Sequence, residues 1–221
     1  MSTPQNTPNL VIANKKYSSW SLRAWIALAH ADAPFSETMI KLRTPGYKEA
    51  LQRHSPNGLA PALVDGDIVI CESVAILEYL NETHVKDGLL PKDVALRAEI
   101  RAAAARMHAG FTALRGAFPM NLARAPSPID YDQAVADDIA AVLSLWETSL
   151  EKYGGPFLFG DWSMADCMYL PVVTRFNTYA VDVSAHPLSK KYMDRMLELP
   201  AFKTWRDAGV AETEVIEDYM R

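Results

Sequence analysis

The segment from Ser55 to Ser73 constrains this chain most, because it places a proline, a tight turn and a helix start close together. Pro61 opens a short apolar run that predicts a strand, and Ile68–Cys71 predicts the returning strand. Asp65-Gly66 predicts the two-residue turn between them, since aspartate and glycine tolerate the positive φ that hairpin turns require. The segment therefore predicts a β-hairpin that leads directly into a helix.

The proline at the entrance of this hairpin has a second consequence. Proline donates no hydrogen bond to a sheet, so it belongs at the first residue of a strand or on an edge strand. If the Ala60–Pro61 bond is cis, as about 5–6% of X-Pro bonds are, Ala60 turns its N–H and C=O toward a ligand. An extended peptide can then pair with these groups as an added strand. An ordinary strand-entry proline is the alternative.

Glu72 and Ser73 precede an apolar helical pattern, so they lie at a helix N-terminus, which favours anions. Together, Pro61, the hairpin and the Glu72-Ser73 pair resemble the glutathione-binding half of the soluble glutathione transferases. The resemblance implies that Ala60 pairs with the cysteinyl backbone of glutathione, and that Glu72 and Ser73 hold its γ-glutamyl end. The charges agree, because Ser73 and the helix N–H groups suit a carboxylate while Glu72 suits an ammonium group.

The residues around this segment complete a β-α-β-α-β-β-α order, which is the thioredoxin-like order. Short apolar runs predict buried strands, and apolar residues at helical spacing predict the helices between them. The additional elements are a strand at 9–14, a helix at 20–32, a strand at 35–42 and a short helix at 47–53. We expect this α/β thioredoxin-like domain to occupy residues 1–84.

The rest of the chain predicts only helices. We expect a linker at 85–91 and an all-α domain at 92–221, which together with the first domain is the glutathione transferase architecture. One long apolar stripe runs from Leu96 to Phe118, and a second long helix is predicted from Ile129 to Tyr153. Residues 163–166 predict a capping box. With the residues before them they are similar to the capping motif of the transferase family, whose serine and aspartate act in folding.

Composition excludes several classes of protein. Twenty-two basic and 27 acidic residues give a net charge of −5, whereas nucleic-acid binding requires a basic excess on one face. Cys71 and Cys167 form no CxxC pair, and their apolar surroundings predict core residues. We find no secretory leader pattern and no apolar run as long as a bilayer span. We therefore expect a soluble, cytoplasmic protein that binds no nucleic acid, no membrane and no metal.

The start of the first helix is the expected place for chemistry, because in a thioredoxin-like domain it faces the cis-proline. Redox relatives have two cysteines there, but this chain has Ser18-Ser-Trp-Ser21, which excludes dithiol exchange at that position. A hydroxyl at a helix N-terminus suits a thiol supplied by a ligand. A charge-assisted hydrogen bond contributes roughly 1.5–3 kcal/mol and the helix dipole ~0.3–1 kcal/mol. At ~1.4 kcal/mol per unit, these lower a thiol pKa of ~8.5 by about one to three units without a histidine.

Ser18 is the first candidate for that hydroxyl. The run from Ser18 to Arg23 is similar to the Ser-Ser-Cys-Ser-x-Arg signature of the zeta class, whose members include maleylacetoacetate isomerases. Ser18 matches the serine assigned to catalysis there, and Trp20 stands in place of the cysteine. Tyr17 competes as thiol partner, since other classes use tyrosine, and Ser19 is a further candidate. As alternatives, the two serines only cap the helix, and Arg23 either orients the site or pairs with a surface acid.

Two further parts of the site have several candidates. Leu59 stands where relatives often have a polar residue, so the glycine carboxylate of glutathione has three possible partners, Lys41, Arg43 and His54. We expect the electrophile pocket between the two domains. Its candidate walls are side chains on the predicted helices: Met107, His108, Phe111, Arg115 and Arg175. Each of these also has a purely structural interpretation.

These interpretations predict a glutathione transferase in which a thiolate stabilised by Ser18 attacks a small electrophilic carbon. The family resemblance implies a homodimer that takes glutathione as co-substrate. One alternative is a zeta-type isomerase, in which the thiolate adds to a double bond, permits rotation and leaves, while Arg23 and Arg175 hold a dicarboxylate. The other alternative is a non-catalytic interaction protein that has kept the fold. The intact set of candidate glutathione-binding residues argues against the latter.

Overall fold

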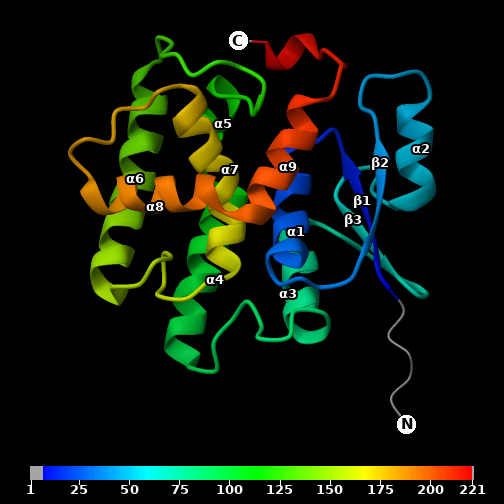
Figure 1. The fold of residues 1–221 in the computed structure, drawn as a ribbon, viewed down its shortest axis with the longest axis horizontal. Coiled ribbons are helices and arrows are strands. Elements are labelled where there is room, and N and C mark those ends of the chain that lie inside the picture. The colour runs from blue at the N-terminus through cyan, green and yellow to red at the C-terminus, as the bar shows by residue number, and fades with distance from the viewer. Residues whose placement is uncertain (1–6, 221) are drawn as a thin grey trace.

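The computed structural model describes residues 7–220, and its sheet lies in the first half of the chain (Figure 1). The strands pair in the order β2-β1-β3-β4, with β1 parallel to β2, antiparallel to β3, and β3 antiparallel to β4. They are β1 (Asn9–Ala13), β2 (Ser36–Ile40), β3 (Ala62–Asp65) and β4 (Ile68–Cys71). β1 lies inside the sheet and is largely buried, as its apolar run predicts.

Three helices complete this half: α1 (Ser19–His30), α2 (Tyr47–His54) and α3 (Ser73–Thr83). The element order is therefore the predicted thioredoxin-like one. The hairpin turn comes one residue later than predicted, because Asp65 still pairs with Ile68 and the connection is Gly66-Asp67. Gly66 supplies the positive φ, at 59°. Asp65 stays in the strand, where its carboxylate accepts a hydrogen bond from the Tyr79 hydroxyl at 2.8 Å.

The second half is helical, as predicted. After Cys71 the described residues contain no strand, only isolated bridges between residues 157 and 161. The elements are α4 (Val94–Ala109), α5 (Thr112–Ala117), α6 (Gln133–Tyr153), α7 (Met164–Thr178), α8 (Pro187–Glu198), α9 (Pro200–Val210) and the 3₁₀-helix η1 (Glu217–Tyr219). Together with the sheet domain, this confirms the predicted fold class.

Two predicted helices differ from the observed ones. The apolar stripe from Leu96 to Phe118 is not one helix, because the chain breaks at Gly110 and Phe111, where Phe111 has a left-handed φ of 55°. The break lets the backbone N–H of Leu114 reach the Asp138 carboxylate on α6. The helix predicted from Ile129 begins only at Gln133, because the Asp132 carboxylate caps it through the Val135 N–H at 3.0 Å.

Helix α1 joins the two halves, because it packs against α3 on the sheet side and against α7 and α9 on the helical side. Helix α7 is buried along almost its whole length and begins with the predicted capping box of Ser163 and Asp166. Cys167 lies in this core, as expected. Cys71 does not, since it is only partly buried at the end of β4, with its sulfur 3.3 Å from the Ser55 hydroxyl.

The C-terminal segment, residues 211–220, turns back over the first half of the chain. It lies beside the loop between β1 and α1 (Figure 1) and ends in η1. Ile216 is buried, and the Glu214 carbonyl accepts a hydrogen bond from the Tyr17 hydroxyl at 3.2 Å. No local sequence pattern predicts a contact between segments so far apart in the chain.

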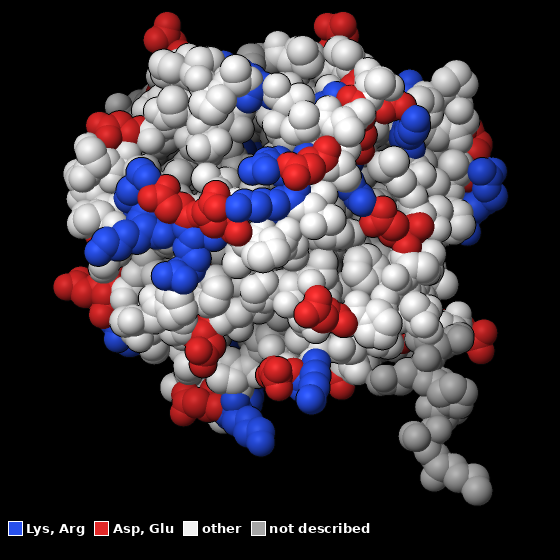
Figure 2. Space-filling view, in the orientation of Figure 1, with Lys and Arg blue, Asp and Glu red and all other residues white. Residues whose placement is uncertain are grey.

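The surface carries both charge signs. Figure 2 shows Lys and Arg interspersed with Asp and Glu across one face. Several of these side chains form ion pairs on α8 and α9, such as Lys190–Asp194 and Arg206–Asp207. No helix within residues 7–220 has both the length and the apolar character that crossing a bilayer requires.

Candidate active site

A cavity of about 690 Å³ lies where the two halves meet. The loops after β1 and β2, helix α2 and the loop before β3 line it from one side. Arg115, Pro119 and Arg175 line it from the helical half, and the C-terminal segment closes a further side. A smaller cavity of about 90 Å³ shares Trp20 and Ala60 with it and reaches the start of α3. Since Asn57 and Leu59 also line both, the two cavities adjoin along one lined surface.

The Ala60–Pro61 peptide bond is cis, and Ala60 lines both cavities. Pro61 is buried immediately before β3, so the sheet ladder begins only at the next residue. Leu59 is 59% exposed at the rim, and its backbone N–H is taken by the Asn57 side chain at 3.0 Å. The backbone of Ala60 therefore lies at the junction of the two cavities, where an extended peptide can pair with it.

The smaller cavity ends at Glu72 and Ser73. Glu72 precedes α3 with a positive φ of 74° and is exposed. Its carboxylate accepts a hydrogen bond from Asn57 at 3.3 Å and lies 3.7 Å from the His108 imidazole. Ser73 is 2% exposed, and its hydroxyl has no hydrogen-bond partner among the described residues. A carboxylate beside a helix N-terminus with an unused hydroxyl suits a zwitterionic amino-acid group.

Ser18 caps α1 at the wall of the larger cavity. Its hydroxyl oxygen accepts from the Ser21 N–H at 3.3 Å, and its proton is donated to the Ser21 hydroxyl at 2.8 Å. Ser21 is fully buried and accepts in turn from the Ala13 N–H at the end of β1. Because the first turn of α1 contains no acidic side chain, its positive end is not neutralised locally. Ser18 thus presents a fixed hydroxyl at an electropositive helix end.

Ser19 and Arg175 form a pair across the domain junction. The Ser19 hydroxyl accepts from the Arg175 guanidinium at 3.1 Å, and both side chains line the cavity. The remaining nitrogens of Arg175 donate to the carbonyls of Phe118 and Pro171. Burial, together with the positive charge of Arg115, lowers the pKa of Arg175 to about 10. The position of the Arg175 side chain is therefore fixed by hydrogen bonds.

Tyr17 lines the cavity but is 2% exposed, and its hydroxyl donates to the Glu214 carbonyl at 3.2 Å. Its ring contacts that of Tyr219, with centroids 5.1 Å apart. Burial raises the pKa of Tyr17, with added repulsion from Glu212 and Glu214. The geometry directs the single tyrosine proton to the C-terminal segment, which leaves the serines as the available hydroxyls.

Trp20 contacts two arginines of the site. The Arg23 guanidinium lies 4.3 Å from the centre of the Trp20 ring and that of Arg115 lies 5.4 Å from it. Arg23 is fully buried, donates to the carbonyls of Met168 and Ser19, and is not among the residues that line either cavity. Burial, and then Arg175 and Arg115, lower its pKa well below the usual value. Arg23 thus connects α1 to α7, and within residues 7–220 it forms no ion pair with a surface acid.

The three candidates for the glycine carboxylate of glutathione are placed differently. Arg43 lines the cavity and donates to the Asp218 carboxylate at 2.8 Å. Lys41 is paired with Glu214, and neither it nor His54 is among the cavity residues. Lys48 lines the cavity beside Gln52, and sequence reasoning missed both. Their i,i+4 spacing on α2 was the signal that could have found them.

The candidate walls from the second half divide in the same way. Arg115 and Arg175 line the larger cavity, and His108 lines the smaller one with its ring 5.4 Å from that of Trp20. Met107 and Phe111 instead lie in the hydrophobic core and line neither cavity. Met107 lies on the inward face of α4 and Phe111 at the break after it, and both positions pack against neighbouring helices.

Comparison with known proteins identifies the architecture. Residues 17–83 match the family model of the glutathione S-transferase N-terminal domain, and residues 97–208 match that of the C-terminal domain. The chain is 30% identical to a probable maleylacetoacetate isomerase of Caenorhabditis elegans, over 84% of this chain and 87% of that protein. It is 29% identical to a zeta-class glutathione S-transferase of Euphorbia esula, over 90% of each.

A solved structure has the same fold. A glutathione transferase homologue from Burkholderia, with bound glutathione, superposes with a TM-score of 0.69 at 20% identity, over 93% of this chain and 98% of that one. The two family models together cover most of the chain, from the loop that carries Ser18 to the end of α9. The protein belongs to the glutathione S-transferase family and is a glutathione-dependent enzyme.

Proposed function

We propose that this enzyme binds glutathione along the two joined cavities and stabilises its thiolate through Ser18, for attack on a small electrophile. The observation that carries the proposal is the continuity of the lined surface. It leads from the Ser18 hydroxyl past the cis peptide bond at Ala60 to the unused hydroxyl of Ser73. A tripeptide in extended conformation has its sulfur, its central backbone and its charged end in this order.

The charged ends of glutathione then have partners of opposite charge. The γ-glutamyl carboxylate meets Ser73 and the N–H groups of α3, and its ammonium group meets Glu72. The cysteinyl backbone pairs with Ala60. Arg43 and Lys48, both lining the larger cavity, suit the glycine carboxylate. Leu59, the apolar residue at the rim, has no polar role in this arrangement.

The thiolate forms without a general base. When the sulfur occupies the cavity, the Ser18 hydroxyl rotates its proton from Ser21 to the sulfur and keeps accepting from the Ser21 N–H. The thiol proton passes to water. The charge-assisted bond and the helix end lower the pKa of the thiol by about one to three units, at ~1.4 kcal/mol per unit. The sulfur lone pair then forms the bond to carbon as the electrophile loses its leaving group or accepts the pair.

Titration of the bound glutathione thiolate by its ultraviolet absorbance tests this proposal. In the wild type we expect a pKa clearly below that of free glutathione. In Ser18→Ala it rises by at least about one unit, which is a tenfold loss of thiolate at a fixed pH below the pKa. Asp132→Ala is the matched control, since it removes the cap of α6, and Asp132 lines neither cavity. An unchanged titration in Ser18→Ala would transfer the role to Ser19.

A second candidate function is cis-trans isomerisation of an unsaturated dicarboxylate. The observation in its favour is the group of arginines at the cavity, among which Arg115 and Arg175 face it and form no ion pair with a carboxylate in the described part of the chain. The relatives named maleylacetoacetate isomerase agree. The thiolate would add to the double bond, allow rotation and leave. Arg23, shielded by Trp20, takes no direct part, so Arg115 replaces it beside Arg175.

Product analysis separates the two candidates. We expect an isomerase to convert a cis dicarboxylate without net consumption of glutathione, and a transferase to consume glutathione with a halogenated or epoxide electrophile. Assembly as a homodimer and a cytoplasmic location are proposals that rest on the family resemblance alone.

A further inference from the structure

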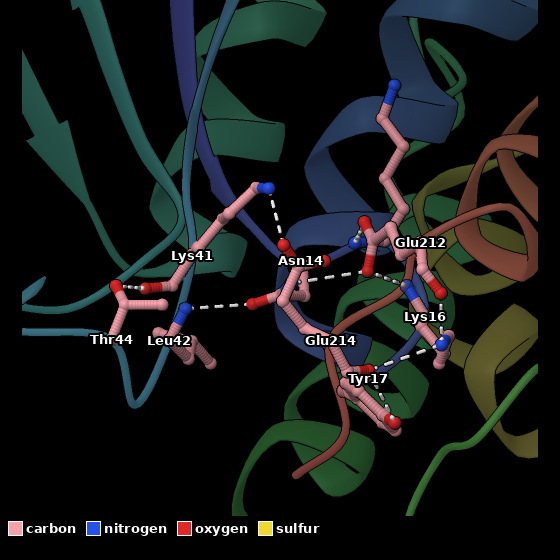
Figure 3. A network of polar contacts seen from close by, with 9 residues as sticks. Asn14, Lys16, Tyr17, Lys41, Leu42, Thr44, Glu212 and Glu214 are labelled. Atoms are coloured by element: carbon pink, nitrogen blue, oxygen red, sulfur yellow. Dashed lines mark hydrogen bonds and ion pairs between the residues drawn. The ribbon is translucent and has the colours of Figure 1, made fainter.

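Glu212, just after α9, holds the loop that precedes Ser18. One carboxylate oxygen accepts the Lys15 N–H at 2.6 Å. The other accepts the Lys16 N–H at 3.3 Å and the Asn14 side-chain amide at 3.2 Å. Figure 3 shows this carboxylate facing the loop from the opposite end of the chain. Hydrogen bonds from N–H groups to a charged acceptor are stronger than those between neutral groups.

Asn14 connects the loop held by Glu212 to two walls of the cavity. Its carbonyl accepts the N–H groups of Tyr17 and Ser18, at 3.2 and 2.8 Å, which makes the turn that delivers Ser18 to the start of α1. Its side-chain oxygen accepts the Leu42 N–H at 2.8 Å, in the loop after β2 (Figure 3). Asn14 is fully buried, so these three bonds are shielded from water.

The end of α9 seats the same loop. Trp205 donates its indole N–H to the Lys15 carbonyl at 3.0 Å. Gly209 lies so close that an added Cβ would come within 2.9 Å of the Lys16 backbone nitrogen. The buried Lys16 ammonium donates to the carbonyls of Glu212 and Glu214. Backbone and side-chain contacts from α9 and the segment after it therefore fix this loop in place.

We propose that Glu212 is a positioning residue for the thiol site, because it fixes the turn from Asn14 to Ser18 at which the Ser18 hydroxyl and the start of α1 meet the sulfur of glutathione. This inference rests on the proposed function. Without the carboxylate, the N–H groups of Lys15 and Lys16 have lost their acceptor and turn toward water, so the turn relaxes and Ser18 is held less closely to the sulfur.

The test compares Glu212→Ala and Glu212→Gln with the wild type by titrating bound glutathione thiolate. We expect the thiol pKa to rise by about half a unit to one unit in Glu212→Ala, a three- to tenfold loss of thiolate below the pKa. Glu212→Gln, which keeps the shape and one acceptor oxygen, is expected to lie between. Affinity for S-methylglutathione, which has no thiol to ionise, stays within about threefold because Ala60 and Ser73 are untouched.

Glu147→Ala is the matched control. The Glu147 carboxylate likewise accepts two backbone N–H groups and a hydroxyl, from Leu188 and Ser189 at the start of α8, far along the chain from the thiol site. We expect it to lower the melting temperature and leave the thiol pKa unchanged. If Glu212→Ala does not fold, Glu212→Gln carries the test.

Two results would overturn the inference. One is a thiol titration of the Glu212 variants that matches the wild type. The other is an equal shift in Glu147→Ala, which would show a general loss of stability. A wild-type titration with no lowered thiol pKa is a different result, since it defeats the proposed function itself and removes the basis of the inference.

Discussion

Helices α1 and α7 each have a serine as N-cap residue, and the two helix starts differ in what surrounds that serine. At the start of α7, where Ser163 is the N-cap, the buried Asp166 carboxylate accepts from the backbone N–H and the hydroxyl of Ser163, both at 2.9 Å, and from the Leu158 N–H. Helix α1 has Ser18 as its N-cap and no acid in its first turn, and its start lines the cavity. The start of α7 is therefore closed by an internal acid, whereas the start of α1 is open to the cavity.

The difference lies in what neutralises the positive end of each helix. At α7 an internal carboxylate supplies the negative charge, so the site is complete and stabilises the fold. At α1 no internal group does so, and an anionic ligand such as a thiolate has that place. In this pair of helices, the acid in the first turn distinguishes the closed, structural cap of α7 from the open one of α1 at the cavity.

The largest effect that tests this comparison is on stability. Asp166→Ala leaves the N–H groups of Ser163 and Leu158 buried without their acceptor, so we expect the free energy of unfolding to fall by about 3 kcal/mol. Chemical denaturation measures it. The thiol pKa of bound glutathione is expected to stay at the wild-type value, because α7 begins away from the cavity. A shifted thiol pKa would show that the two helix starts are not separate.

A smaller effect is expected at a third helix start, that of α3. Ser73 is buried and its hydroxyl has no partner within residues 7–220, so removing it leaves no broken bond in the free enzyme. We expect Ser73→Ala to keep or slightly raise the melting temperature while glutathione affinity falls about tenfold, the effect of roughly one charge-assisted hydrogen bond. Titration calorimetry and thermal unfolding measure the two quantities.

Ser163→Ala is the matched variant for this experiment, since it removes a serine from the closed start of α7. It is expected to lower the melting temperature and leave glutathione affinity unchanged. If Ser73→Ala instead destabilises the protein and binds glutathione normally, α3 belongs with α7 as a structural start, and the proposed site for the γ-glutamyl end is wrong.

Much of the fold and of the glutathione side follows from short local patterns. The hairpin, the cis bond before Pro61 and the capping box depend on residues a few positions apart, and the structure has all three. The turn at Gly66 moved by one residue, because the Asp65 carboxylate is held by a distant tyrosine. Local patterns thus place elements well and their ends less well.

The other parts of the site depend on contacts between distant residues. Arg23 and Arg115 both contact the Trp20 ring, yet Arg23 is buried between α1 and α7 while Arg115 lines the cavity. Glu212 reaches Lys15 across almost the whole chain. No periodicity in the sequence marks such a pair, because the contact exists only when α9 packs against the loop before Ser18.

The smallest effect is expected at Asp218, an acidic residue at the cavity onto which the start of α1 opens. Asp218 lines the cavity and pairs with Arg43, but both side chains are mostly exposed, unlike the buried Asp166. An exposed ion pair contributes little, so Asp218→Asn is expected to leave stability unchanged. It frees Arg43 for the glycine carboxylate of glutathione, and we expect affinity to rise about two- to threefold at low salt and less at high salt.

Asp194→Asn, which breaks the exposed pair with Lys190 on α8, is the control and leaves affinity unchanged. A fall in affinity would mean that Asp218 orients Arg43 for the ligand, and the open start of α1 would then have an acid of its own.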